Sequence, residues 1–287
     1  MIKQVAVLND LSGFGNCSLA AALPVLSVLG IQCNPIPTMS LTGQGGYAVA
    51  YRKDLTDMLP LYTEAWSANH VAFAGIYSGY LTGPRQIAHV FDFLSVFRKE
   101  DTFLLVDPVM GDNGYTYQIF SPELLDGMKR LSRQADLITP NLTEACLLAD
   151  VASEEIFSDM EPEERLNWVT RIACTLRNRA DRPQDVVITG VVSRSQNGNC
   201  VSNVVCTEDG IHISSHPWFE ASYSGTGDLF ASAMCGLRMN GYSTVHAMDI
   251  AARFLHCSIA DAAAIHADKN NGVPFQRHLK ELISHAK

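Results

Sequence analysis

The sequence predicts an α/β fold built around a buried, mainly parallel sheet. Short apolar runs recur along the 287 residues and alternate with stretches of helical period, which is the pattern of successive βαβ units. Strands of a parallel sheet are covered on both faces, so they appear in the sequence as continuous apolar runs. A hydrophobic content of 47% is ample for a core of that size.

The expected elements follow one another in a regular order. The strands are the apolar runs Gln4 to Leu8, Val71 to Ile76, Phe103 to Val106, Leu137 to Thr139 and Val186 to Thr189. The helices are the stretches of helical period at Ser18 to Leu29, Pro84 to Phe97, Pro122 to Gln134, Glu163 to Arg177, Asp228 to Met239 and Thr244 to Ala264. Pro84 and Pro122 suit the first turn of a helix, where no N–H is needed.

Two regions interrupt this rhythm. Residues 32–55 combine a Pro-rich strand candidate with the Gly cluster Thr42–Gly46, which predicts a flap over a site at about residues 38–55. Residues 198–217 alternate in polarity between the turn signals Asn197-Gly198 and Asp209-Gly210, which predicts an antiparallel hairpin at one edge of the sheet. Because no repeat or linker separates the elements, we expect one domain over residues 1–287.

Composition excludes several classes of partner. The formal net charge is −9, and no stretch carries the clustered Lys and Arg that nucleic acid requires. The apolar run from Leu19 to Ile31 is too short to span a bilayer and contains Pro24. The eight cysteines form no C-x-x-C pair, which favours reduced thiols. We therefore expect a cytoplasmic protein that binds neither nucleic acid nor membrane.

The strongest chemical signal is the motif Ser224–Asp228, just before an apolar helix. Its glycines allow a tight turn, and the consecutive N–H groups of Gly225, Thr226 and Gly227 at a helix N-terminus form an anion hole. Asp228 beside it has two interpretations. It accepts a proton from an alcohol that attacks a phosphoryl group, or it only caps the helix or favours its dipole.

Two further polar loops follow expected strands. DPVMGDNG, residues 107–114, supplies two acids, Asp107 and Asp112, for a cation near phosphates, although Asp-Pro and Asn-Gly also form ordinary turns. The loop Thr139–Glu144 opens a helix, and Glu144 either holds a hydrated Mg²⁺ or is simply an acid in the first helical turn.

Two nucleotide-binding motifs are weak or absent. The loop Asn9–Gly15 has G-x-G after a strand but no third glycine at the Rossmann spacing. No G-x-x-x-x-G-K-[ST] motif occurs. A nicotinamide-dependent oxidoreductase is therefore a poor alternative, and the chain is not a P-loop kinase.

Taken in order, these loops resemble the ribokinase-like superfamily, whose members phosphorylate hydroxymethyl groups with ATP and Mg²⁺. Within it the chain is similar to the pyridoxal kinases along nearly its whole length. The residues that carry the resemblance are Ser12, Ala20–Pro24, Leu29-Gly30, Gly79–Leu81, and DPVMGDNG followed by Tyr117. The resemblance implies a three-layer sandwich with helices on both faces of the sheet, a B6 vitamer as substrate, and a homodimer.

The resemblance also implies roles for individual residues. Asp228 corresponds to the catalytic base, and Gly225 and Gly227 to the glycines of the anion hole. On the vitamer side, Ser12 corresponds to a residue that hydrogen-bonds the pyridine ring, and Thr42 and Tyr80 to vitamer contacts. On the nucleotide side, Asp107, Thr139 and Thr189 correspond to positions for a monovalent cation such as K⁺ and for the phosphates, and Asp112, Asn141 and Glu144 to the Mg-ATP side.

The sequence departs from the family pattern at two places. The flap reads Met39–Tyr47 where the family usually has a Ser-Asn-His-Thr type sequence before its Tyr, and Gly190 stands after Thr189 where many members have Ser. The nearest alternative is a hydroxymethylpyrimidine kinase of thiamine synthesis, whose anion-hole loop characteristically has Cys where this chain has Asp228. A non-catalytic vitamer-binding protein is the other alternative, and retention of Asp112, Glu144 and Asp228 together argues against it.

Overall fold

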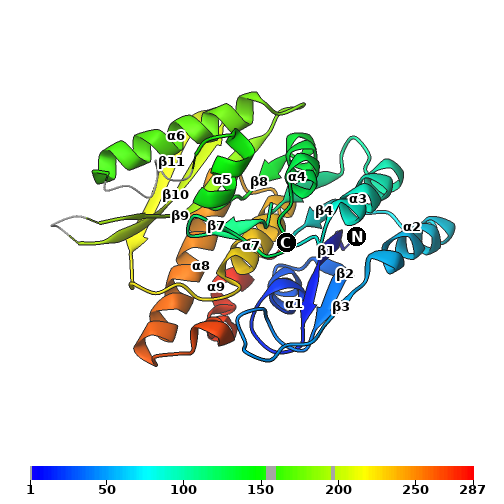
Figure 1. Cartoon of the computed structure of the whole chain (residues 1–287), viewed down its shortest axis with the longest axis horizontal. Coiled ribbons are helices and arrows are strands. Elements are labelled where there is room, and N and C mark those ends of the chain that lie inside the picture. Colours follow the sequence, from blue (N-terminus) through cyan, green and yellow to red (C-terminus); the bar gives the residue numbers. More distant parts are fainter. Residues whose placement is uncertain (1, 153–159, 195–197) are drawn as a thin grey trace.

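The computed structural model describes residues 2–152, 160–194 and 198–287, and this part of the chain contains a nine-stranded sheet (Figure 1). The strand order is β11-β10-β9-β8-β5-β4-β1-β2-β3. The strands are β1 (Gln4–Ser12), β2 (Gln32–Leu41), β3 (Arg52–Asp54), β4 (Gly75–Ser78), β5 (Phe103–Val106), β8 (Leu137–Ile138), β9 (Asp185–Ser193), β10 (Cys200–Thr207) and β11 (Gly210–Pro217). A separate two-stranded ribbon is formed by β6 (Gly111–Asp112) and β7 (Tyr115–Thr116).

The middle of the sheet is parallel and its edges are antiparallel. β2, β1, β4, β5, β8 and β9 pair in parallel, whereas β10 and β11 form an antiparallel hairpin on β9. At the other edge, the short strand β3 pairs antiparallel with the end of β2. The predicted mainly parallel sheet with an edge hairpin is therefore confirmed.

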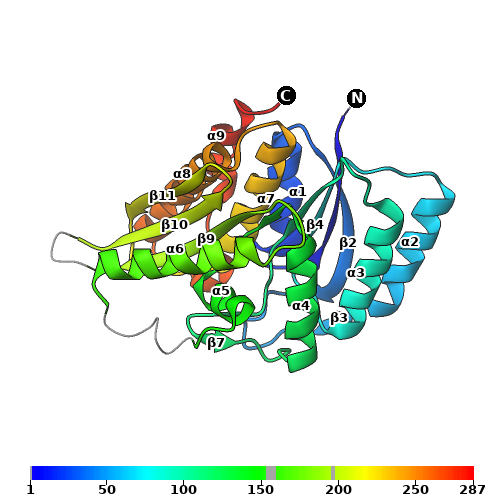
Figure 2. The same ribbon diagram turned by 90° about the horizontal axis from the view of Figure 1, so that it is seen from above.

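Helices cover both faces of the sheet and complete the predicted three layers (Figures 1 and 2). One layer contains α1 (Ser18–Val28), α7 (Thr226–Met239), α8 (Thr244–Ala264) and the short α9 (Lys280–Ile283). The other contains α2 (Leu59–Ala68), α3 (Pro84–Phe97), α4 (Pro122–Gln134), α5 (Leu142–Ala149) and α6 (Pro162–Asn178). Pro84 and Pro122 lie in the first turns of α3 and α4, as predicted.

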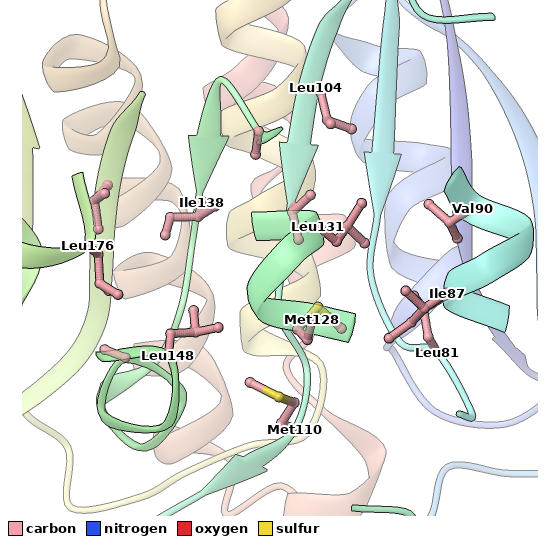
Figure 3. Packing of buried hydrophobic residues seen from close by; sticks show 14 of the residues in the cluster. Leu81, Ile87, Val90, Leu104, Met110, Met128, Leu131, Ile138, Leu148 and Leu176 are labelled. Atoms are coloured by element: carbon pink, nitrogen blue, oxygen red, sulfur yellow. The ribbon is translucent and has the colours of Figure 1, made fainter. Parts of the chain in front are cut away.

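The central strands of the sheet supply both hydrophobic cores, because successive side chains point to opposite faces. In β1, Ala6 and Leu8 belong to one buried cluster, and Val5 and Val7 belong to the other. Figure 3 shows the first cluster, in which side chains of α3 and α4 face apolar residues of the sheet. The central strands are thus covered on both sides, which explains their continuous apolar runs.

One expected element needs correction, and one element was missed. The apolar residues from Val71 to Ala74 precede β4 and lie outside the sheet. Phe73 packs instead between Trp66 of α2 and Phe97 of α3, with ring centroids 5.3 and 5.4 Å away. Helix α2 itself was not predicted.

The Pro-rich strand is accommodated by its position. Pro35 and Pro37 lie in β2, where the register pairs them with Val7 and Asn9 of β1. β3 pairs only with Met39–Leu41, so the prolines lie where β2 is the edge of the sheet. A proline cannot donate to a second neighbour, and an edge position does not require that bond.

Other expectations concern the turns, the thiols and the membrane. Asp209-Gly210 forms the turn of the hairpin, whereas Asn197 lies outside the described residues. All eight cysteines are free thiols. Within the described residues, no helix combines the length and the apolar character needed to cross a bilayer.

Candidate active site

The polar loops singled out in the sequence meet at one edge of the sheet. Tyr80 follows β4, Asp107 follows β5 and Thr139 follows β8, while Ser12 ends β1. These strands are adjacent and parallel, so their carboxyl ends lie side by side at one edge of the sheet, where ligands bind in open α/β sheets. Figure 2 places both chain termini at the opposite end of the strands.

The N-terminus of α7 has the geometry of an anion site. Gly225 precedes the helix in the left-handed region, with φ of +80°, and a Cβ there would lie 2.0 Å from the carbonyl oxygen of Asn16. No side chain caps the helix at Gly225, so the N–H groups of the first turn are available to a ligand. Nothing lies within 4 Å of the place a Gly227 Cβ would occupy, so this approach is open.

Asp228 lies in that first turn and is held from two sides. Asn9 Nδ2 donates to Asp228 Oδ1 over 3.0 Å, and the backbone N–H of Ser18 at the start of α1 also donates to this carboxylate. Burial raises the pKa of Asp228 to about 6, and the neighbouring Asp10 carboxylate adds to the rise. The result is a carboxylate that is ionised near neutral pH and basic enough to accept a proton.

Asp107 and Thr139 form a buried pair close enough to Asp228 for its charge to act on Asp107. Thr139 Oγ1 donates to Asp107 Oδ1 over 3.1 Å, and both residues are buried. Burial and the charge of Asp228 raise the pKa of Asp107 to about 8.

Asn141 and Glu144 form a capping box that starts α5. Asn141 Oδ1 accepts from the N–H of Glu144, and Glu144 Oε2 accepts from the N–H of Asn141. Glu144 Oε1 accepts from the N–H of Met110, and Asn141 Nδ2 donates to the carbonyl of Gly111. The capping box therefore also fixes the loop that carries Asp107 and Asp112. Burial and the charge of Asp107 raise the pKa of Glu144 well above its usual range.

The other residues predicted on the nucleotide side lie near this box. Thr189 of β9 pairs with Asn141 through an isolated parallel bridge, and its N–H donates to the carbonyl of Pro140. Asp112 is exposed in the β6–β7 ribbon, where it accepts from Asn113. Gly190 has φ of +71° and open space at its Cβ position.

The donor set fits cations that arrive with a nucleotide. The charges acting on Asp107 and Glu144 come from other carboxylates, so the cluster lacks compensation. In the described part of the chain, no three His, Cys, Asp or Glu side chains group closely enough to hold a metal ion alone. Mg²⁺ in kinases takes one or two carboxylates together with phosphate oxygens and water, and a pair of acids is sufficient for that.

The residues predicted to contact the vitamer lie at the end of β1, after β4 and in the flap. Ser12 Oγ donates to Asp10 Oδ2 over 3.2 Å, and both side chains are buried. The N–H of Tyr80 donates to Asn9 Oδ1, and its carbonyl accepts from Thr38. The Thr42 hydroxyl accepts from the N–H of Tyr51, so in this structure it closes the flap on itself.

The flap is fastened to a loop near the anion site. Gln44 donates to the side chain of Asn270 over 2.9 Å, and the Tyr47 hydroxyl donates to Asn271. The carbonyl of Lys269 in the same loop accepts from the N–H of Ser224. The loop thus connects the flap to the turn that precedes α7.

Asn9 and Asp10 were missed as site residues. The signal was available in the sequence, because both are polar and directly follow the apolar run of the first strand. The weak G-x-G pattern directed attention to the glycines of that loop. In the structure the two residues lie beside Asp228 and Ser12.

Comparison with known proteins agrees with this arrangement. The sequence profile of the phosphomethylpyrimidine kinase family matches residues 68–273. A candidate phosphomethylpyrimidine kinase from Bacteroides thetaiotaomicron, crystallised with pyridoxal, is 33% identical with a TM-score of 0.88, and the match covers 98% of this chain and 96% of that one. Pyridoxal kinase from Lactobacillus plantarum is 27% identical with a TM-score of 0.87, over 99% and 98% of the two chains.

A relative from a third organism is also named as a pyridoxal kinase. A candidate pyridoxal kinase of Schizosaccharomyces pombe is 29% identical over 243 residues, which are 81% of this chain and 72% of the relative. The family profile spans more than half of the chain. The chain therefore belongs to the phosphomethylpyrimidine kinase family of the ribokinase-like superfamily, it is a phosphotransferase, and several of its relatives are pyridoxal kinases.

Proposed function

We propose that this protein transfers the γ-phosphoryl group of ATP to the 5′-hydroxymethyl group of pyridoxal, giving pyridoxal 5′-phosphate in vitamin B6 salvage. Pyridoxine and pyridoxamine share this hydroxymethyl group and are further substrates. The observation that carries the proposal is Asp228, which lies at the uncapped N-terminus of α7 and is held there by Asn9. A base beside an anion site is the arrangement that phosphoryl transfer to an alcohol requires.

The residues divide the reaction between them. Asp228 accepts the proton of the hydroxymethyl group as its oxygen attacks phosphorus. The N–H groups of the turn at Gly225, Thr226 and Gly227, together with the helix dipole, stabilise the charge that develops on the transferred group. The open approach beside Gly227 supports this assignment, because a ligand can reach the amides there.

Cations complete the nucleotide site. We assign Mg²⁺ to Glu144 and Asp112 together with the phosphates, with Asn141 and Thr189 beside them, and K⁺ to Asp107 and Thr139. When bound, these cations would neutralise the negative charge of the phosphates. The raised pKa values of Asp107 and Glu144 support this assignment, because a buried carboxylate without a positive partner gains from a cation.

The Glu144 assignment predicts two effects of Glu144→Ala. The Mg²⁺ concentration for half-maximal activity rises, because a carboxylate is lost. Thermal stability falls by several degrees, because the N–H groups of Asn141 and Met110 lose their acceptor. Titration of activity with Mg²⁺ and a thermal melt measure both. Glu123→Ala is the matched control, since Glu123 is an exposed acid in the first turn of α4. A lower melting temperature with an unchanged Mg²⁺ curve would leave Glu144 only its helix-starting role.

The acceptor pocket is predicted at Ser12 and Tyr80. Ser12→Ala and Tyr80→Ala should each raise KM for pyridoxal several-fold and leave KM for ATP nearly unchanged. A lost neutral hydrogen bond costs about 0.5–1.5 kcal/mol, and a lost ring contact costs a similar amount. Steady-state kinetics with each substrate varied in turn gives both constants. Equal increases in the two KM values would place the vitamer elsewhere.

Hydroxymethylpyrimidine is the second candidate acceptor, because the family profile carries the phosphomethylpyrimidine kinase name. Two observations favour pyridoxal. A protein 33% identical to this chain was crystallised with pyridoxal, and Asp228 stands where hydroxymethylpyrimidine kinases characteristically have Cys. The ratio of kcat/KM for pyridoxal and hydroxymethylpyrimidine tests the choice. A ratio in favour of hydroxymethylpyrimidine would contradict it, and tight vitamer binding without turnover would indicate a non-catalytic binding protein.

We further propose a cytoplasmic homodimer in which residues 1–287 form one domain with a flap at 38–55. The continuous sheet supports the single domain. Val49, Tyr51 and Leu61 support the dimer, since they are large apolar residues exposed in or after the flap. The thiols, which are all free, support the reducing compartment.

A further inference from the structure

Asn9 is a fully buried amide in the central strand β1. Its exposed fraction is 0%, and its neighbours in the sheet are β2 and β4. A buried amide is costly unless its hydrogen bonds are made, so its partners reveal what it holds in place.

The partners of Asn9 fix which way its amide faces. Asn9 Oδ1 lies 2.9 Å from the backbone nitrogen of Tyr80 and 2.9 Å from that of Asp10. A backbone N–H can only donate, so the oxygen of the amide must face these two groups. The NH₂ group is thereby directed at Asp228 Oδ1, 3.0 Å away. The acceptor side of one amide holds the strand that leads to Tyr80, and its donor side holds the carboxylate of Asp228.

Gly79 provides the space for this arrangement. A Cβ at Gly79 would lie 2.6 Å from both Cγ and Nδ2 of Asn9. Gly79 is not in the left-handed region, so its backbone conformation would accept alanine. What the position excludes is a side chain, because a side chain there would displace Asn9.

We propose that Asn9 is a positioning residue for phosphoryl transfer, which aims the Asp228 carboxylate and fixes it relative to the acceptor pocket at Tyr80. The inference rests on the proposed function, because it assigns to Asp228 the role of base. Asn9 acts through Asp228 and need not touch the substrate. A base must lie within hydrogen-bond reach of the proton it removes, so a carboxylate free to rotate would react more slowly without binding substrate less well.

The test is Asn9→Asp, which keeps the size of the side chain and both acceptor bonds but replaces the donor to Asp228 with a second carboxyl group. Because two adjacent acids raise each other's pKa, kcat is read on the alkaline plateau of its pH profile, where both are ionised and no donor faces Asp228. We expect kcat to fall about 10- to 100-fold, the range that corresponds to loss of one hydrogen bond to a charged group. KM for ATP and KM for pyridoxal should each stay within about two-fold. In an Asp228→Asn background the same substitution should lower the residual kcat no further, because the group on which Asn9 acts is gone.

Asn240→Asp is the matched control. Asn240 is also a buried amide, 3% exposed, whose Nδ2 donates to the carbonyls of Leu29 and His285. It follows the last residue of α7, ~20 Å of helix away from Asp228. This variant should lose stability and keep kcat.

Gly79→Ala tests the same contact without changing either partner, and it decides the matter if Asn9→Asp does not fold. Its kcat should fall and KM for ATP should be preserved, whereas KM for pyridoxal should rise modestly, because displacing Asn9 also loosens its bond to the N–H of Tyr80. Unchanged kcat in a folded Asn9→Asp or Gly79→Ala variant would overturn the inference and leave the proposed function intact. A further loss of kcat in the double variant would do the same, because it would mean that Asn9 acts by another route. A parent enzyme that does not phosphorylate pyridoxal would overturn the proposed function and this inference together.

Discussion

Replacing Asp228 with asparagine is expected to lower kcat by roughly 10²- to 10⁴-fold while ATP still binds. Asparagine keeps the shape of the side chain, but it cannot accept the proton of the hydroxymethyl group. The N–H groups at the start of α7 remain in place, so the nucleotide site is preserved. Steady-state assays give kcat, and titration calorimetry gives the affinity of the variant for ATP. Turnover near that of the parent would remove Asp228 from the role of base, and loss of ATP binding would indicate a role in the nucleotide site.

The same carboxylate predicts the pH dependence. Burial and Asp10 raise the pKa of Asp228 from 3.8 to about 6. A base works in its ionised form, so activity is present above this pKa and is lost as pH falls through about 6. A profile of kcat/KM against pH should therefore decline about tenfold per unit below pH 6. In the Asp228→Asn variant this acid limb should disappear from the residual activity, and its persistence there would assign it to another group.

Gly225→Ala is expected to lower kcat by about 10²-fold and to reduce stability. Alanine at φ of +80° costs about 1–2 kcal/mol, and its Cβ would meet the carbonyl oxygen of Asn16 at 2.0 Å. Because the carbonyl of Asn16 is a backbone group, the clash can be relieved only if the turn itself moves. The N–H groups that stabilise the transferred phosphoryl group then move with it. Loss of oxyanion donors costs about 10²–10³ in kcat in other enzymes. Kinetics and a thermal melt separate the two effects.

Gly241→Ala is the control for this prediction. Gly241 has nearly the same φ, +83°, but its Cβ position lies near only the end of the Lys287 side chain, at 3.9 Å. The backbone strain is thus matched without a clash and at the other end of α7. We expect a similar strain cost without a change in kcat. If kcat of Gly241→Ala fell as much as kcat of Gly225→Ala, the loss in both variants would be due to reduced stability and not to the anion site.

The sequence pattern predicts the layers of the fold because buried segments must consist of apolar residues. Strands buried on both faces must be apolar throughout, and β5 therefore coincides with its predicted range, Phe103–Val106. The apolar run Val71 to Ala74 is a false prediction of the same rule. Residues outside the sheet can be just as apolar when a helix covers them, as α2 covers Phe73.

The site could be predicted in part from the same pattern. Polar residues at the ends of adjacent parallel strands must converge, so Asp107 and Thr139 come together as their hydrogen bond shows. The bond of Asn9 to the N–H of Tyr80 follows from the same rule, because β1 and β4 are adjacent parallel strands. The bond of Asn9 to Asp228 could not be predicted, because it joins positions 219 residues apart and depends on the packing of α7 on the sheet.

Glu144 shows why the two interpretations of a motif need not exclude each other. Its carboxylate completes the capping box of α5, as the helix-start interpretation predicts. The same bonds place it in a buried acidic cluster with Asp107, as a cation site requires. Residue type and spacing indicate both uses, and the Mg²⁺ titration of Glu144→Ala separates them.

The central claim is that the enzyme moves a phosphoryl group from ATP to the 5′-hydroxymethyl group of pyridoxal. The most direct measurement is ³¹P NMR of a reaction containing the protein, ATP, Mg²⁺ and pyridoxal. The account predicts that ADP and pyridoxal 5′-phosphate appear together in equal amounts, and that neither forms at an appreciable rate with the Asp228→Asn variant. Release of inorganic phosphate without a phosphorylated vitamer, or no consumption of ATP, would contradict it.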